Sequence, residues 1–150
     1  MIRDQIKTAL TGAMKAGDKP RTAALRLVQS ALKNREIELR GASNVPDDDV
    51  VVTEVLQKMV KQRRESIDMY QKGGRDELAA IEAAEVAVIE EFLPKQMSDA
   101  EIGAAILALI AETGAASIKE MGKVMALMKE RHAGELDMSK ASQILKAKLS

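Results

Sequence analysis

Glycine and proline residues divide this chain into segments that each have the apolar periodicity of an amphipathic helix. Gly17, Gly114 and the pair Gly73 and Gly74 each follow such a segment. Glycine just past the last helical residue is a common helix stop, because it adopts a left-handed backbone conformation without a steric penalty. In the first segment the apolar residues that recur at helical spacing are Ile6, Ala9, Leu10 and Ala13. These signals predict an all-α protein of about seven helices.

Residues typical of helix starts give the bounds of the predicted helices. Four helices are predicted over residues 2–16, 20–40, 47–72 and 75–92. Ser98 with Glu101 and Ser117 with Glu120 have the spacing of capping boxes, which predicts two further helices that end at Gly114 and before Gly134. Asp137 or Ser139 is expected to cap a short final helix.

Pro94 marks the predicted domain boundary, because the residue before a proline is disfavoured in the helical conformation. We therefore expect an N-terminal helical bundle over residues 1–94 and a C-terminal three-helix domain over residues 95–150. In the second domain Met121, Met125 and Met128 are expected to form core contacts, and Gly122 to permit close helix packing.

Several kinds of chemistry are excluded by composition. The chain has no cysteine, so it has neither disulfides nor a thiolate nucleophile, and its single histidine, His132, is interpreted as a helix-end residue. We predict no catalytic residue, no metal and no cofactor. Asp47, Asp48 and Asp49 could hold Mg²⁺, but capping of the third helix is the favoured explanation.

The overall charge is balanced, with 23 basic and 23 acidic residues, so nucleic-acid or membrane binding would require a local patch. The sequence has no run of about 20 apolar residues that would predict a membrane span. The first ten residues carry charges of both signs, unlike a signal peptide. From these properties we expect a cytoplasmic protein that does not bind membranes.

Basic side chains on two helices form the most informative pattern. Arg26, Lys33 and Arg40 are seven residues apart, which is almost two helical turns, so they are expected on one stripe. Lys58, Lys61 and Arg64 form a similar strip on the third helix. Such strips can meet the phosphates of a nucleic acid. The alternative is a solvated surface that needs no partner, in which Arg64 pairs with Asp68 one turn away.

Several longer motifs make the chain similar to the bacterial YqeY-like family, whose members are stand-alone relatives of the tail of the GatB subunit of tRNA-dependent amidotransferase. The motifs are Leu25 with Arg26, Lys33–Glu38, Lys61–Ile67 with Tyr70, Phe92–Ser98, and Met121–Met125 followed by Gly134 and Asp137. The resemblance covers nearly the whole chain. His132–Asp137 is more acidic than the basic glycine turn expected from this family, which argues against phosphate contact there.

The resemblance implies an accessory module associated with the transamidation of tRNA-bound Glu or Asp, and it carries over no catalytic set. We expect the partner to be tRNA or a tRNA-handling enzyme. The predicted nucleic-acid-binding residues are Arg26, Lys33, Arg40, Lys61 and Arg64, with Lys119, Lys123 and Lys129 in the second domain.

Two alternatives remain open from the sequence. The chain could be a carbon–nitrogen ligase that uses glutamine as amide donor, alone or in a complex, with Glu82 and Glu85 in its site. It could also be a helical adaptor that binds a protein through its aliphatic and methionine-rich surface.

Overall fold

A computed structural model describes all residues, 1–150, and every regular element in it is a helix. The all-α prediction is confirmed. The chain forms two compact units, Met1–Leu93 and Pro94–Ser150, and each has its own buried core.

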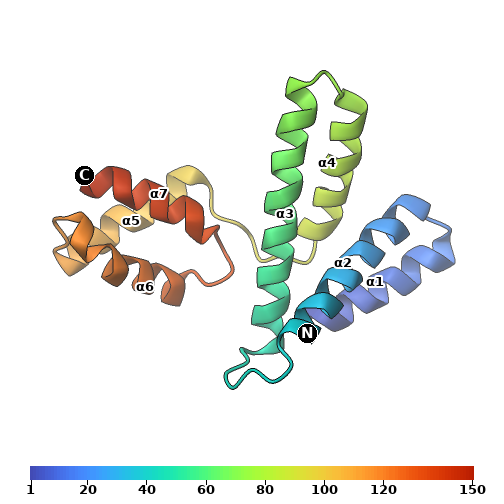
Figure 1. The fold of residues 1–150 in the computed structure, drawn as a ribbon, viewed down its shortest axis with the longest axis horizontal. Coiled ribbons are helices and arrows are strands. Elements are labelled where there is room, and N and C mark those ends of the chain that lie inside the picture. Colours follow the sequence, from blue (N-terminus) through green and yellow to red (C-terminus); the bar gives the residue numbers. More distant parts are fainter. The chain divides into compact units, whose positions relative to one another are not determined.

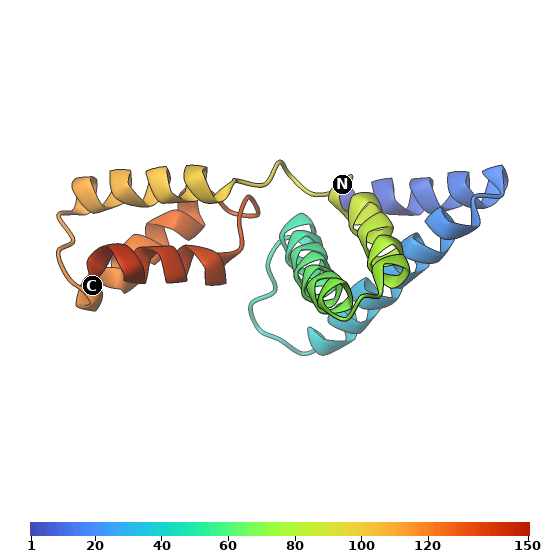
Figure 2. The ribbon, with the colours of Figure 1, turned by 90° about the horizontal axis from the view of Figure 1, so that it is seen from above.

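The first unit is built from four helices (Figures 1 and 2). They are α1 (Ile2–Ala16), α2 (Lys19–Glu38), α3 (Asp48–Lys72) and α4 (Asp76–Glu90), with α1 packed against α2 and α3 against α4. Gly17 ends α1 with a left-handed φ of 70°, and the Asp18 side chain caps α2 by accepting a hydrogen bond from the Arg21 amide. The chain can therefore reverse direction between α1 and α2 within a few residues.

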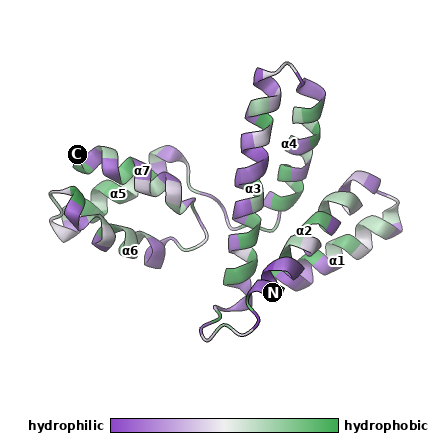
Figure 3. Ribbon diagram, in the orientation of Figure 1, coloured by the Kyte–Doolittle hydropathy of each residue, from purple (hydrophilic) through white to green (hydrophobic).

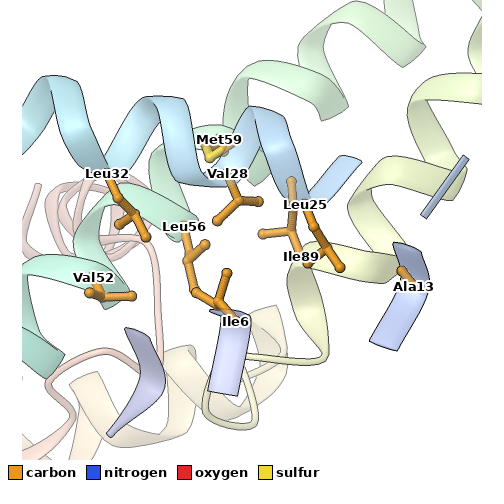
Figure 4. Close-up of a cluster of buried hydrophobic side chains, with 9 residues drawn as sticks. All are labelled: Ile6, Ala13, Leu25, Val28, Leu32, Val52, Leu56, Met59 and Ile89. Atoms are coloured by element: carbon orange, nitrogen blue, oxygen red, sulfur yellow. The ribbon is translucent and has the colours of Figure 1, made fainter. Parts of the chain in front are cut away.

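Aliphatic side chains from all four helices form the core of the first unit (Figure 4). The buried residues are Ile6, Ala13, Leu25, Val28, Leu32, Val52, Leu56, Met59 and Ile89. Burying a side chain such as Leu25 or Leu56 removes its whole apolar surface from water, which contributes about 1.5–3 kcal/mol per large aliphatic residue. This core holds α1 and α2 in the positions from which their polar faces reach solvent.

The acidic run Asp47–Asp49 at the start of α3 has a role that the sequence did not indicate. Asp48 accepts a hydrogen bond of 2.8 Å from Arg3 Nη2, and Asp49 Oδ1 accepts one of 3.0 Å from the Ile2 amide. Asp47 occupies the N-cap position without a side-chain cap hydrogen bond. Two of the three aspartates thus bind the start of α1 to the start of α3.

Helix α4 buries one face and exposes a large aliphatic side chain on the other. Ile81 is 59% exposed, whereas Ala79, Val86 and Ile89 are buried. Ala79 and Val86 are seven residues apart, almost two turns, and so lie on one stripe facing the interior. Ile81 is therefore on the outer surface of α4.

The second unit contains three α-helices and one short 3₁₀ helix. They are α5 (Asp99–Thr113), the 3₁₀ helix η1 (Ile118–Glu120), α6 (Met121–Arg131) and α7 (Met138–Leu149). The predicted capping box at Ser117 and Glu120 is confirmed, with both of its hydrogen bonds formed. The Ser98 side chain caps α5 by accepting from the Glu101 amide, and Asp137 caps α7. Local sequence signals thus set where these helices begin.

The core of the second unit is also aliphatic. Val124, Met128 and Leu145 are almost fully buried, and Met121 and Met125 are partly buried against the same cluster. The interpretation of the methionine stripe as core is confirmed. The expected packing role of Gly122 is wrong, because a Cβ atom at this exposed position would meet nothing within 4 Å.

No single helix is both long enough and apolar enough to cross a membrane. One pair, Asp99–Thr113 with Ile118–Arg131, meets that test only when taken together, and a bend of 95° separates its two parts.

Candidate functional site

The three basic residues predicted to form a stripe on α2 are all exposed. Arg26 and Lys33 lie on the helix, and Arg40 lies in the turn that follows its last residue, Glu38. Figure 3 shows the C-terminal end of α2 as strongly hydrophilic. Lys33 and Arg40 line one cavity of about 370 Å³, and Arg26 lies outside its lining.

This cavity lies between α1 and the second half of α2 and is called the α1–α2 cavity below. From α1 it is lined by Arg3, Ile6 and Lys7. From α2 and the following turn it is lined by Gln29, Leu32, Lys33, Glu36, Ile37 and Arg40. Ile6 and Leu32 are buried members of the core, so the floor is aliphatic and the charged side chains surround it.

The charge around the cavity is not balanced within the chain. Arg3 is bound to Asp48, which leaves three cations, Lys7, Lys33 and Arg40, and one carboxylate, Glu36. None of these three cationic side chains forms an ion pair or a side-chain hydrogen bond within the chain. Three positive charges less one negative charge leave an excess of two positive charges. The cavity is therefore suited to an anion.

Beside the cavity, the pKa values of Arg3 and Asp48 are shifted because the two side chains bind each other. The hydrogen bonds from Arg3 hold the pKa of the Asp48 carboxyl below its usual value, and they raise the pKa of Arg3. Both side chains therefore stay charged at neutral pH and bind each other. Arg3 contributes less net charge to the cavity than its guanidinium alone would.

The basic residues on α3 have partners that the sequence did not predict. Arg64 forms an ion pair with Glu90 of α4 rather than with Asp68, and Asp68 binds Lys72 at 2.8 Å. Lys61 is exposed and also has an interaction within the chain. Both predicted site residues on α3 therefore have partners already.

The second-unit lysines, Lys119 in η1 and Lys123 and Lys129 in α6, are all exposed. Lys119 and Lys123 are four residues apart, about one turn, and share a side. Lys129 follows Lys123 by six residues, which at about 100° per residue places it on a different side of the helix. These three lysines do not form one strip.

Lys7 was not among the predicted site residues. It lies on α1, and only the packing of α1 against α2 brings it to the same cavity as Lys33. The available signal was its position next to Ile6, a residue of the buried face. A lysine beside such a residue borders the contact between two helices.

The carboxylates considered for an enzymatic site are engaged in ion pairs. Arg63 Nε lies 2.9 Å from Glu85 Oε2 and 4.0 Å from Glu82 Oε2, and all three side chains are largely buried. His132 lies at the end of α6, as predicted, with Nδ1 3.2 Å from Glu135 Oε2. No three histidine, aspartate or glutamate side chains are grouped so that they could hold a metal ion.

Comparison with known proteins gives the family. A sequence model described as Yqey-like protein matches residues 3–149, which is nearly the whole chain. The chain belongs to the YqeY-like family. The family assignment made from the sequence motifs is confirmed, and so is the description of the chain as a YqeY-like module.

Relatives among curated proteins come from yeasts and carry the name "Altered inheritance of mitochondria protein 41, mitochondrial". The protein from Eremothecium gossypii is 35% identical over 88 residues, covering 59% of this chain and 46% of the relative. The protein from Saccharomyces cerevisiae is 32% identical over 97 residues, covering 65% and 51%. The protein from Lachancea thermotolerans is 31% identical over 109 residues, covering 71% and 57%. The YqeY-like chain spans about half the length of the curated relatives that it matches.

The expectation of a cytoplasmic location is wrong, because these relatives are named as mitochondrial proteins. The expectation depended on the absence of a long apolar run and on first ten residues that are unlike a signal peptide. Neither property distinguishes the cytoplasm from the interior of mitochondria.

Proposed function

We propose that this YqeY-like protein is a non-catalytic accessory module that binds tRNA and acts beside a tRNA-dependent amidotransferase. The primary contact is the basic face of α2, with Arg26, Lys33 and Arg40, extended by Lys7 of α1. Lys61 and Arg64 of α3 are further contacts on the first unit, and Lys119, Lys123 and Lys129 are secondary contacts on the second unit.

One observation carries this proposal. Lys7, Lys33 and Arg40 surround the α1–α2 cavity and have no partner within the chain, whereas Arg64 is paired with Glu90. Like charges held close together without counter-charges disfavour the free protein and favour a bound polyanion. Binding to phosphates releases counterions, and this release gives a cationic face its affinity for nucleic acid.

The choice of tRNA rests on the chemistry of this face and on the sequence resemblance. The only aromatic residues are Phe92 and Tyr70, and both are partly buried, so successive bases of a single strand have no stacking platform. A folded RNA presents phosphates at fixed positions and is recognised through its shape. The motifs shared with the GatB tail support an association with the amidotransferase.

Residue chemistry supports a role without catalysis. The chain has no cysteine, and its single histidine contacts Glu135 at the end of α6. Glu82 and Glu85, the carboxylates of the ligase alternative, lie against Arg63 as part of the contact between α3 and α4. An activated nucleophile requires an adjacent base, and these groups provide none.

The test is a binding titration of the full chain against total tRNA between 50 and 200 mM salt. We expect binding to weaken steeply with salt, because the slope of log affinity against log salt scales with the number of phosphates contacted. The double substitution Lys33→Glu with Arg40→Glu should weaken binding and reduce the slope by about one to two, roughly one for each phosphate contact that is lost.

The matched control is Lys15→Glu with Lys19→Glu. It changes the net charge by the same amount at the opposite end of the α1–α2 pair (Figure 1), outside the cavity. Equal weakening by the two double variants would show a response to net charge alone and would contradict the proposed face. No binding at 50 mM salt would reject the tRNA-binding function. Glutamine-dependent conversion of Glu-tRNA by the purified chain would reject the non-catalytic role.

A further inference from the structure

The α1–α2 cavity combines features that a simple phosphate-binding face does not need. A cationic stripe on a helix surface binds phosphates without any hollow. Here the cations surround a space of about 370 Å³ whose floor is formed by the buried side chains of Ile6 and Leu32. Pockets of roughly 300–1,000 Å³ are typical of small-ligand sites. The cavity therefore fits a compact ligand rather than a continuous backbone.

The apolar part of the cavity extends to its rim. Ile37, on the last turns of α2, lines the cavity and is 47% exposed. A ligand that covers this half-exposed aliphatic side chain removes apolar surface from water, which favours binding. The ligand that matches this arrangement has an apolar, flat or compact body next to its negative charge.

Polar groups at the cavity match the rest of a nucleotide. Lys33 and Lys7 supply ammonium groups for a phosphate. The Gln29 amide can both donate and accept hydrogen bonds, as the edge of a base requires. The Arg40 guanidinium is planar and has no partner within the chain, and unstacked bases in RNA complexes commonly stack on arginine planes.

We propose that the α1–α2 cavity binds one unstacked nucleotide of the bound RNA, with its phosphate at Lys7 and Lys33 and its base between Arg40 and Ile37. This proposal rests on the proposed function, because the RNA supplies the nucleotide. The base lies over the aliphatic floor, and Gln29 contacts its edge. Such a site recognises RNA by an unpaired base at a fixed distance from the cationic stripe.

The first test uses adenosine 5′-monophosphate as the probe, with the full chain and methyl-detected NMR. We expect saturable shifts at the methyl groups of Ile6, Leu32 and Ile37. Ribose 5-phosphate carries the same phosphate and sugar without the base and should bind at least three-fold more weakly. Equal binding of the two compounds, or no shift at the methyl groups of these three residues, would overturn the nucleotide site.

The second test uses Ile37→Ser with Leu27→Ser as its matched control. Leu27 is on the same helix, is 45% exposed and lies outside the cavity. Both substitutions replace an exposed aliphatic side chain in a helix, so their effects on folding should be alike, and circular dichroism checks this. We expect Ile37→Ser to weaken binding of an RNA hairpin with an unpaired loop about three- to ten-fold, and Leu27→Ser to leave it unchanged. Neither variant should change binding of a fully paired RNA duplex.

The outcomes separate this inference from the function on which it rests. If tRNA binds and depends on Lys33 and Arg40 while Ile37→Ser behaves like Leu27→Ser, the nucleotide site is rejected and the proposed function stands. If tRNA does not bind at all, both are rejected. If poly-glutamate displaces adenosine 5′-monophosphate from the cavity methyl groups as effectively as an RNA loop does, the cavity responds to negative charge alone and the nucleotide site is rejected.

Discussion

Gly12 and Gly17 are close in the sequence but have different backbone conformations. Gly12 lies inside α1, and a Cβ atom there would meet nothing within 4 Å, whereas Gly17 ends the helix with a φ of 70°. We expect Gly12→Ala to stabilise the protein by about 0.5–1 kcal/mol, because alanine loses less backbone entropy in a helix. Gly17→Ala should destabilise it by about 1–2 kcal/mol, because side chains are strained in the left-handed region.

Urea unfolding of both variants measures the two changes. Opposite signs are the decisive result, since the chemical substitution is the same at both positions. A destabilising Gly12→Ala would mean that α1 is not helical at this position.

The Asp48 carboxyl makes the stability of the fold depend on pH. Arg3 holds the pKa of this carboxyl below its usual value, so the pair stabilises the fold at neutral pH. The stabilisation is present above the pKa of an unfolded aspartate, about 4, and is lost as the pH falls through the lower pKa of the folded state. Because both side chains are more than a third exposed, the effect at neutral pH should stay below about 1 kcal/mol.

Asp48→Asn compared with Asp47→Asn tests this effect. Asp47 precedes α3 without forming a side-chain cap hydrogen bond and serves as the control. The free energy of unfolding at pH 7 should be lower for Asp48→Asn than for the parent protein, and the difference should shrink as the pH falls below about 4 and the Asp48 carboxyl becomes protonated. A difference of the same size at pH 7 and pH 3 would show that the effect does not come from the charge of Asp48.

Among the elements, α3 and α4 are joined by ion pairs of Arg63 and Arg64 that differ in burial. Arg63 binds Glu85 with side-chain exposures of 16% and 24%, whereas Arg64, which binds Glu90, is 62% exposed. Removing a partner from a buried pair leaves an uncompensated charge, whereas exposed pairs contribute little. We expect Arg63→Met to destabilise the protein by about 1–3 kcal/mol and Arg64→Met by less than about 1 kcal/mol.

The two neighbouring arginines control for each other, because each substitution removes one positive charge from α3. Urea unfolding measures both. Equal losses would show that net charge, and not burial of the Arg63 contact, determines the result.

The helices could be predicted from sequence because their boundaries depend on neighbouring residues. Gly17 and the Ser117–Glu120 capping box act within one turn of the chain, and both are found as predicted. Contacts between helices depend on packing instead. The sequence suggested Arg64 with Asp68 one turn away, but the packing of α4 brings Glu90 to Arg64.

The candidate site likewise has one part that depends on spacing within a helix and one part that depends on packing between helices. Spacing along the predicted helix suggested that Lys33 and Arg40 lie near each other, and both line the cavity, although Arg40 is in the turn after α2 and Arg26 is outside the lining. The cavity beside them, and the contribution of Lys7 to it, arise from the contact between α1 and α2. No periodicity within one helix contains that information, so the proximity of Lys33 and Arg40 was predictable and the cavity was not.

For the whole molecule, net charge is a poor guide to binding. The chain carries 23 basic and 23 acidic residues, and many of them pair with each other, as Arg131 does with Glu112. The charges at the α1–α2 cavity stay unbalanced because Lys7, Lys33 and Arg40 have no ion-pair partner within the chain. Attraction for an anion therefore comes from the local arrangement of charge.

The two units have separate cores, and this makes a prediction about how the molecule unfolds. Leu145 is fully buried in the core of the second unit, and Leu56 is fully buried in the core of the first. Each Leu→Ala substitution should destabilise its own unit by about 2–5 kcal/mol, because it removes apolar contacts and leaves a cavity. Neither core contains residues of the other unit, so the loss should stay local.

Amide hydrogen exchange resolved by residue distinguishes local from shared unfolding. We expect Leu145→Ala to accelerate exchange in α5, α6 and α7 and to leave the slowest amides of α2 and α3 unchanged, with Leu56→Ala giving the reverse pattern. Faster exchange in both units after either substitution would show that the two cores unfold as one cooperative system. Exchange confined to the altered unit would allow charge variants at the α1–α2 cavity to be interpreted without effects from the second unit.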